Sequence, residues 1–142
     1  MNLYGHWETP WEIDFNIPWV GFIYQITNLV NQKKYIGKKL FTSTSRKKVK
    51  GKINRKVTIK ESNWKQYTSS SKQLNSDILT YGKSNFKFEI LSLHESKSSL
   101  AMEETYQLVI NDVLRNDLWM NGLIPPVKFK VLPMTSNELN YK

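Results

Sequence analysis

The chain has no cysteine, so disulfides and thiolate metal sites are both excluded. It also has no long apolar run, and its longest stretches of hydrophobic residues are far too short to cross a bilayer. The first residues, "MNLYGHWETPWEIDF", lack the basic start and apolar centre of a signal peptide. We therefore expect a cytoplasmic protein with no membrane partner.

Acidic residues are also scarce: there are 12, against 21 lysines and arginines, which gives a net charge of +9. Such an excess favours a polyanionic partner, because neutralised phosphates release their condensed counterions. Charge alone places nucleic acid only somewhat ahead of an anionic membrane or an acidic protein. The length of 142 residues fits one domain with an ordinary core.

Residues 1–20 contain no lysine and are rich in tryptophan and proline. Prolines at both ends of "PWEIDFNIP" argue against a long helix. We expect an extended aromatic arm whose tryptophans pack on the domain. The alternative is a dimer contact made through the same arm.

The stretch "GFIYQITNLVNQKKYIGKK" at 21–39 predicts a β-hairpin, because alternating apolar runs flank a polar turn. The alternation places Phe22, Tyr24 and Ile26 on one face of the first strand. The basic segment that follows, 38–60, contains no acidic residue and predicts a loop or a ribbon around Gly51.

Two helices and a third strand are predicted after the basic segment. "SSSKQLNSDILTYG" has serines for an N-cap and a terminal glycine, "FKFEILSL" alternates as a strand, and "SKSSLAMEETYQLVINDVLR" reads as a second helix. The residues expected to point inward from this second helix are Leu100, Tyr106 or Gln107, Val109 or Ile110, and Val113 or Leu114. We predict an α+β fold, a small three-stranded antiparallel sheet flanked by helices, with an irregular tail at 125–142.

Phe22-Ile23-Tyr24 and Tyr35-Ile36-Gly37 give the chain a resemblance to the GIY-YIG nuclease family. Ten residues separate the two tyrosines, "MEETYQLV" resembles the helix that carries the family's glutamate, and "WMNGLI" resembles its closing asparagine motif. The likeness covers 21–124 and is nearest to phage-type members with a basic insert after the second motif. It implies a metal-dependent endonuclease that hydrolyses phosphodiester bonds in DNA, with RNA not excluded, acting in a bacterial host cytoplasm if phage-encoded.

The resemblance also implies roles for particular residues. Tyr24 and Tyr35 would act at the attacking water, where nearby cations and a metal would favour phenolate. Arg46 would bind the scissile phosphate, with Arg55 as a rival for this role.

Glu104 would hold Mg²⁺ (or Mn²⁺), since one carboxylate suits an ion that keeps most of its waters. Its neighbour Glu103 competes for this assignment but is expected to be exposed, about 100° round the helix. Asn121 would form hydrogen bonds within the site. The residues expected to bind nucleic acid are Lys38, Lys39, Lys47, Lys48, Lys50 and Arg55.

The sequence departs from the family pattern at one position, because Ser69 stands where many members have a histidine. Lys38 or Tyr67 could take over that role, and His6 and His94 are expected to be structural. The departure keeps a second hypothesis open, that of a catalytically inactive DNA- or RNA-binding module on the same fold.

Overall fold

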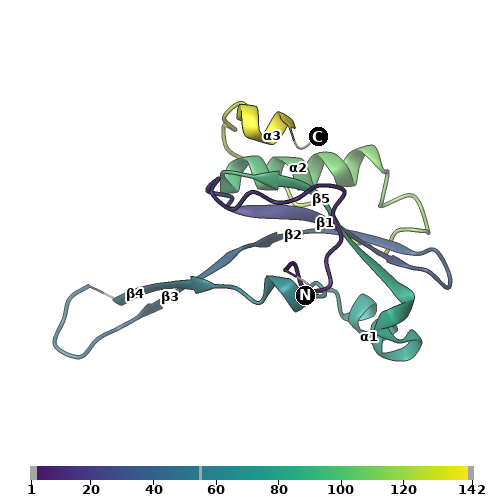
Figure 1. The fold of residues 1–142 in the computed structure, drawn as a ribbon, viewed down its shortest axis with the longest axis horizontal. Helices are drawn as coiled ribbons and strands as arrows, with labels where there is room; N and C mark the ends of the chain where they lie inside the picture. The colour runs from purple at the N-terminus through teal and green to yellow at the C-terminus, as the bar shows by residue number, and fades with distance from the viewer. Residues whose placement is uncertain (1–2, 55, 141–142) are drawn as a thin grey trace.

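The computed structural model describes residues 3–54 and 56–140 and has a three-stranded antiparallel sheet at its centre (Figure 1). β1 (Gly21–Asn28) and β2 (Lys34–Leu40) form the predicted hairpin. β5 (Phe86–His94) pairs with the other edge of β1, which gives the order β2-β1-β5. The predicted α+β class, with helices flanking a three-stranded sheet, is confirmed.

β1 is buried on both faces because a separate core forms on each side of the sheet. Phe22, Tyr24 and Ile26 belong to an aromatic core on one face, which also contains Trp7 and Trp64. Ile23 points the other way, into a smaller aliphatic core under a helix. The predicted alternation along β1 is confirmed, and it directs Tyr24 away from that helix.

The arm before β1 packs on the aromatic face. Trp7 and Trp19 are buried, as expected, and Glu8 forms a parallel bridge with Glu89 beside β5. The indole N–H of Trp7 donates to the carbonyl of Trp64 in a short 3₁₀ helix, η1 (Trp64–Gln66). The arm therefore supplies part of the core.

α1 (Lys72–Tyr81) has the predicted ends. The Ser71 hydroxyl accepts a hydrogen bond from the Leu74 N–H at the start, and Gly82 ends the helix with a φ of +86°. A 3₁₀ turn, η2 (Lys83–Asn85), then leads into β5.

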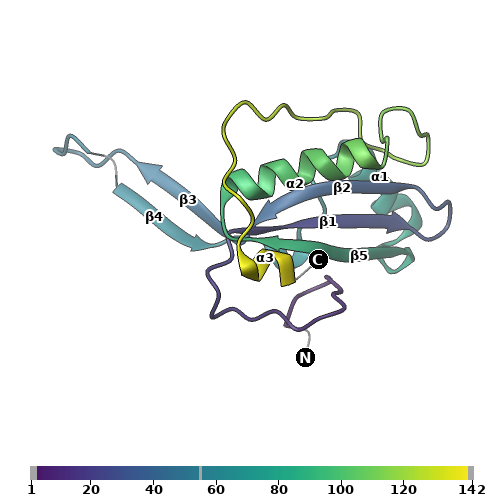
Figure 2. The same cartoon turned by 90° about the horizontal axis from the view of Figure 1, so that it is seen from above.

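α2 (Lys97–Ile110) crosses the second face of the sheet and ends earlier than predicted (Figure 2). Its buried side chains include Leu100, Glu104 and Leu108, which are spaced four residues apart. Val113, just beyond the helix, is also buried. The inward positions expected at Leu100 and at Val113 or Leu114 are therefore confirmed by Leu100 and Val113, and of Tyr106 or Gln107 only Gln107 is half-buried. The inward position expected at Val109 or Ile110 is wrong, because both side chains are exposed.

The tail contains a short helix, α3 (Ser136–Asn140), where irregular structure was predicted. Its Glu138 is buried against β5 and α2, where Oε2 lies 2.8 Å from His94 Nδ1 and accepts a hydrogen bond from the Ser99 hydroxyl. His94 is fully buried in this network, in agreement with a structural role. No helix in the described residues has the length and apolar character needed to cross a membrane.

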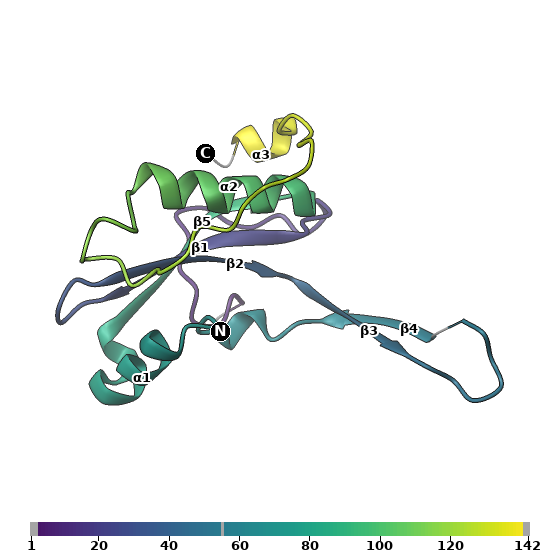
Figure 3. The ribbon, with the colours of Figure 1, turned by 180° about the vertical axis from the view of Figure 1, so that it is seen from behind.

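The basic segment forms a ribbon, one of the two predicted alternatives. β3 (Thr42–Lys47) and β4 (Lys56–Glu61) pair as a separate two-stranded sheet that projects from the domain (Figure 3). The turn contains Gly51 with a φ of +81°. Arg55 lies outside the described residues.

Candidate active site

The two motif tyrosines lie side by side on one face of the sheet. Tyr24 of β1 pairs with Gly37 of β2, Tyr35 precedes Gly37 by two residues, and the tyrosine rings stack with centroids 6.4 Å apart. Gly37 makes room for this arrangement, because a Cβ at this position would collide with the hydroxyl oxygen and Cζ of Tyr24. The glycine of the second motif is therefore explained by close approach of the Tyr24 ring to β2.

Tyr24 is held as a neutral phenol. Its ring is 2% exposed, and its hydroxyl forms a hydrogen bond with Tyr67, whose ring meets it edge-on. Burial raises the pKa of Tyr24 far above its usual 10.0, and the neighbouring Tyr35, Tyr67 and Glu104 raise it further. Tyr24 can donate a hydrogen bond here, but it does not supply a base at neutral pH.

Tyr35 is the more accessible of the pair, since it is only half-buried. Burial raises the pKa of Tyr35, and Glu104 and Tyr67 add to the rise, whereas a hydrogen bond with Ser70 lowers it in part. The expectation that nearby cations and a metal together favour phenolate concerns the metal-bound protein and stays a prediction. In the protein alone, burial and the Glu104 carboxylate raise the pKa of both tyrosines.

Glu104 lies on α2, on the opposite face of the sheet from the two tyrosines, and next to Lys38 of β2. Its Oε1 lies 3.9 Å from the Nζ of Lys38 on β2, and its charge raises the pKa of both Tyr24 and Tyr35. Burial raises the pKa of Glu104 itself, and Lys38 lowers it only in part. A buried carboxylate, two phenols and a lysine therefore interact at the β2 edge of the sheet.

Glu103 lies elsewhere, although it is not the exposed neighbour that the sequence predicted. It is 5% exposed, and its Oε1 accepts a hydrogen bond from Gln107 Nε2 at 3.2 Å. It lines a different pocket, with Leu91 and Ser92 of β5. The helix therefore separates the two carboxylates, but it buries both.

The donor set around Glu104 suits one kind of metal ion. The described residues contain no cluster of three histidine, cysteine, aspartate or glutamate side chains that could enclose an ion. A single carboxylate fits Mg²⁺ or Mn²⁺, which can take their remaining oxygens from water and a substrate phosphate. The raised pKa of Glu104 is consistent with this fit, because the buried carboxylate lacks sufficient positive charge in the protein alone.

Asn121 holds the edge strand β2 through two hydrogen bonds to its backbone. Its side-chain oxygen accepts a hydrogen bond from the Ile36 N–H at 3.0 Å, and its amide donates to the Ile36 carbonyl at 2.7 Å. Ile36 lies between Tyr35 and Gly37, so the two bonds fix the backbone of the second motif. The geometry gives Asn121 a positioning role.

Arg46 is not brought to this cluster. It lies near the outer end of β3, paired with Val57. It lies eight positions after Lys38, which corresponds to about 25 Å of extended chain, and the ribbon extends away from the sheet. The spacing of Arg46 from Gly37 suggested a phosphate ligand, but the chain between them runs out along the ribbon and does not return to the cluster.

The other predicted cations fall into two groups. Lys38 and Lys39 lie at the cluster, where the Lys39 Nζ sits over the Tyr67 ring at 4.1 Å and burial lowers its pKa. Lys47 ends β3, and Lys48 and Lys50 are exposed in the turn of the ribbon.

A groove leads from the first of these groups to the base of the ribbon. It measures about 650 Å³ and begins at Lys38, Lys39 and Tyr67. It continues to Thr44 on the ribbon, with Lys97 of α2 on its wall. Lys97 and Ser70 were not predicted as site residues, and nothing in their local pattern distinguishes them from solvated or capping residues.

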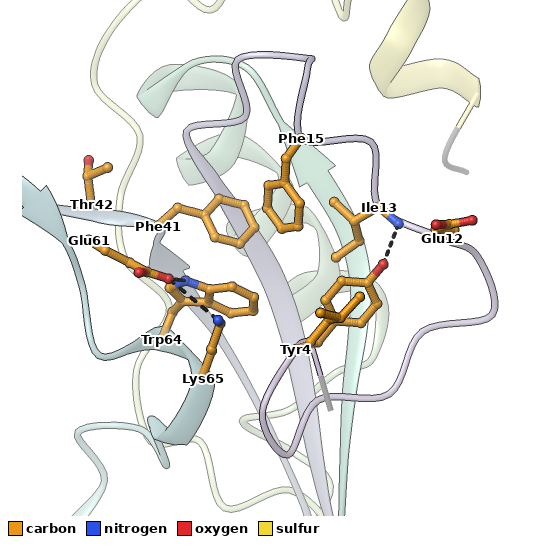
Figure 4. Close-up of a pocket in the computed structure, with 10 residues that line it drawn as sticks. Tyr4, Glu12, Ile13, Phe15, Phe41, Thr42, Glu61, Trp64 and Lys65 are labelled. Carbon is orange, nitrogen blue, oxygen red and sulfur yellow. Dashed lines mark hydrogen bonds and ion pairs between the residues drawn. The ribbon is translucent and has the colours of Figure 1, made fainter. Parts of the chain in front are cut away.

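An apolar pocket of about 490 Å³ lies on the other side of the ribbon's base (Figure 4). Phe41 and Trp64 form its floor, and Phe15 of the arm forms a wall. Glu61 accepts a hydrogen bond from the Trp64 indole at 3.0 Å. The motif tyrosines and Glu104 do not line this pocket, so the pocket does not coincide with the candidate reaction centre.

Ser69 occupies the position of the family histidine in a constrained loop. It is buried with a φ of +80°, and its hydroxyl accepts a hydrogen bond from the Ser71 N–H at 3.1 Å. Its carbonyl accepts from the Asn75 side chain. Ser69 therefore shapes the loop that presents Tyr67 and Ser70 to the tyrosine pair.

The chain matches one family model, described as "Putative endonuclease segE, GIY-YIG domain", over residues 6–124. The match includes both tyrosine motifs, Glu104 and Asn121, and it begins within the aromatic arm. No curated protein and no solved structure matches the chain.

Proposed function

Since the chain belongs to the GIY-YIG endonuclease family, we propose that it is a metal-dependent endonuclease that hydrolyses phosphodiester bonds in DNA. Water attacks phosphorus in this reaction, one P–O bond breaks, and a phosphomonoester and an alcohol are produced. A catalyst must orient the water, neutralise charge on the phosphoryl oxygens and stabilise the leaving oxygen.

The observation that carries the proposal is the electrostatic coupling of Glu104 to both motif tyrosines. The Glu104 carboxylate on α2 raises the pKa of both phenols, on β1 and β2, and burial raises the pKa of Glu104 itself. Perturbed titratable groups of this kind are characteristic of reaction centres. The adjoining groove carries lysines that suit an anionic substrate.

In the proposed mechanism, Lys38 and Lys39 bind the phosphodiester and neutralise its charge. Tyr35, the accessible phenol, orients the attacking water, and Tyr24 fixes Tyr67 beside it through their hydrogen bond. Glu104 holds Mg²⁺ or Mn²⁺, which supplies positive charge to the phosphate and the leaving oxygen. This assignment uses the lysines for the phosphate, since Arg46 lies on the outer ribbon.

The second candidate function is an inactive nucleic-acid-binding module on the same fold. Two observations favour it: Ser69 cannot replace a histidine as an acid or base, and both tyrosines are neutral in the protein alone. Such a module would retain the basic groove and ribbon but would not cut.

A nicking assay separates the two functions. Supercoiled plasmid is incubated with the protein and Mg²⁺, and a parallel sample contains EDTA. The endonuclease should relax the plasmid only with the metal, and Tyr35→Phe should slow nicking roughly 10²-fold, as expected for loss of a positioned polar group. If the protein binds plasmid but leaves it intact with either Mg²⁺ or Mn²⁺, the binding module is the correct description.

A further inference from the structure

The ribbon of β3 and β4 is left uncovered by the rest of the domain. Its strands pair with each other and extend into solvent away from the three-stranded sheet (Figure 3). Every residue of β4 is exposed, including Val57 at 53% and Ile59 at 67%. A two-stranded ribbon alone is only marginally stable in water, so a partner that covers one face would stabilise it.

The register sorts the side chains of the ribbon onto two faces, since directly opposite residues share a face and successive residues alternate. The first, named the Arg46 face, comprises Thr42, Thr44, Arg46, Val57, Ile59 and Glu61. The second, named the Lys47 face, comprises Ser43, Ser45, Lys47, Lys56, Thr58 and Lys60. The one acidic residue, Glu61, lies at the base of the ribbon and bonds to Trp64 and Lys65 there.

The two faces have different chemistry. Lys47 lies directly opposite Lys56, and like charges in such a pair repel each other. A polyanion beside them would remove this repulsion. The Arg46 face instead combines one guanidinium with two exposed β-branched side chains, and it carries no second charge near its outer end.

We propose that this ribbon enters the major groove of B-form DNA, with the Arg46 face toward the base edges and the lysines of the Lys47 face reaching outward to the bordering phosphates. The major groove is about 12 Å wide and admits a two-stranded ribbon. Arg46 can pair bidentately with guanine, and Val57 and Ile59 can contact thymine methyl groups. Lysine stems are long and flexible enough to turn toward either backbone.

The proposal rests on the proposed function and makes its substrate class more specific. Duplex RNA has a deep, narrow major groove that side chains cannot read, so a ribbon of this kind selects duplex DNA. The groove between the ribbon and the tyrosine cluster would carry the backbone of the same duplex to Lys38 and Lys39.

The test measures binding of the full chain to a duplex of about 30 base pairs by fluorescence anisotropy, in EDTA so that nothing is cut. Three further probes are the same duplex with bulky groups on cytosine C5, which fill the major groove, the duplex saturated with the minor-groove ligand netropsin, and the corresponding duplex RNA. The variant of the Arg46 face is Arg46→Ala with Ile59→Ser. The matched control is Lys47→Ala with Lys56→Ala, which removes two phosphate contacts but leaves the Arg46 face intact.

The native protein should bind the C5-substituted duplex at least tenfold more weakly than the plain one, and netropsin should leave its affinity unchanged. The Arg46-face variant should bind the plain and the C5-substituted duplex equally. The control variant, Lys47→Ala with Lys56→Ala, should still bind the C5-substituted duplex more weakly than the plain one. It should reduce the slope of log K against log salt by up to ~2.

Displacement by netropsin, equal affinity of the native protein for the plain and C5-substituted duplexes, or equal affinity for duplex RNA would overturn the proposal. Because binding is measured without cleavage, a failed ribbon proposal leaves the nicking result unaffected. A protein that binds as proposed but never nicks would contradict the endonuclease alone.

Discussion

Replacement of Gly37 by alanine tests the architecture of the tyrosine pair. The added Cβ would overlap the Tyr24 hydroxyl oxygen and would lie 2.5 Å from Cζ and 3.1 Å from Cε1. The ring cannot swing aside easily, because Trp7, Tyr35 and Tyr67 pack around it. Either the ring or β2 must therefore move.

Overpacking of this kind costs about 1–3 kcal/mol of unfolding free energy. In a domain of this size that corresponds to a fall in Tm of roughly 3–10 °C. Because the displaced ring belongs to the proposed reaction centre, nicking should also fall by about 10²-fold or more. DNA binding should persist, since the lysines of the groove and ribbon are unchanged.

Gly122→Ala is the matched control, because a Cβ at Gly122 meets nothing within 4 Å. Its unfolding free energy should stay within about 0.5 kcal/mol of the native value. Thermal unfolding followed by circular dichroism, combined with the nicking assay, gives both readouts. If Gly37→Ala matches Gly122→Ala in both, the Tyr24 hydroxyl does not lie against β2 and the proposed site geometry is wrong.

Further substitutions at four residues test individual side chains. Glu104→Gln should abolish nicking but leave DNA binding intact. It should also raise the unfolding free energy at pH 7, because the folded-state pKa of Glu104 is raised. This gain in stability should disappear as the pH falls below the usual 4.5, which denaturant titrations at several pH values can follow. Glu103→Gln should leave nicking intact, and the reverse outcome would exchange the two assignments. Asn121→Ala should lower the unfolding free energy by about 1–3 kcal/mol through loss of the hydrogen bonds to Ile36. Asn121→Asp keeps only the acceptor, so its unfolding free energy should lie between those of the native protein and Asn121→Ala. Equal stability of the native protein and both variants would contradict the positioning role. Glu138→Gln should destabilise the protein at neutral pH, because hydrogen bonds lower the folded-state pKa of Glu138 despite its burial; the difference should vanish as the pH falls below that pKa, and a difference independent of pH would refute the reasoning.

Local rules predicted much of the fold. The hairpin followed from alternation around a polar turn, and α1 followed from Ser71 at its start and Gly82 at its end. These features depend on neighbours in the chain, so the sequence carries them directly. The bounds of α2 and the helix in the tail depend on tertiary packing and were not recovered.

The inward side of α2 was predicted only in part, for a physical reason. Leu100, Glu104 and Leu108 form one stripe four residues apart, but a search for apolar residues passes over the glutamate in its middle. The predicted face consequently included Val109 or Ile110, which are both exposed, and Tyr106 as the alternative to the half-buried Gln107. A carboxylate in an apolar stripe is itself a signal of function, because it conflicts with the local pattern.

The site was predicted in part for a related reason. Tyr24, Tyr35 and Glu104 meet because strand register and helix packing bring them together, and the ordered family motifs encode that arrangement. Arg46 could not be placed by counting residues from Gly37, since the count does not reveal that the chain leaves the sheet at Thr42. Tyr67 and Ser70 join the tyrosines through a loop whose left-handed Ser69 has no marker in the sequence.

Burial shifts four groups of this site toward their uncharged forms: it raises the pKa values of Tyr24, Tyr35 and Glu104, and it lowers that of Lys39. At neutral pH the raised pKa of Glu104 and the lowered pKa of Lys39 cost stability, because burial disfavours their charged forms. The two tyrosines are neutral in both the folded and the unfolded chain and add no such cost. A phosphodiester beside Lys39 would favour the charged amine, and a divalent cation beside Glu104 would favour the carboxylate. Each partner relieves a different part of the cost. Because the cation and the phosphodiester also attract each other, the two should bind more tightly together than separately.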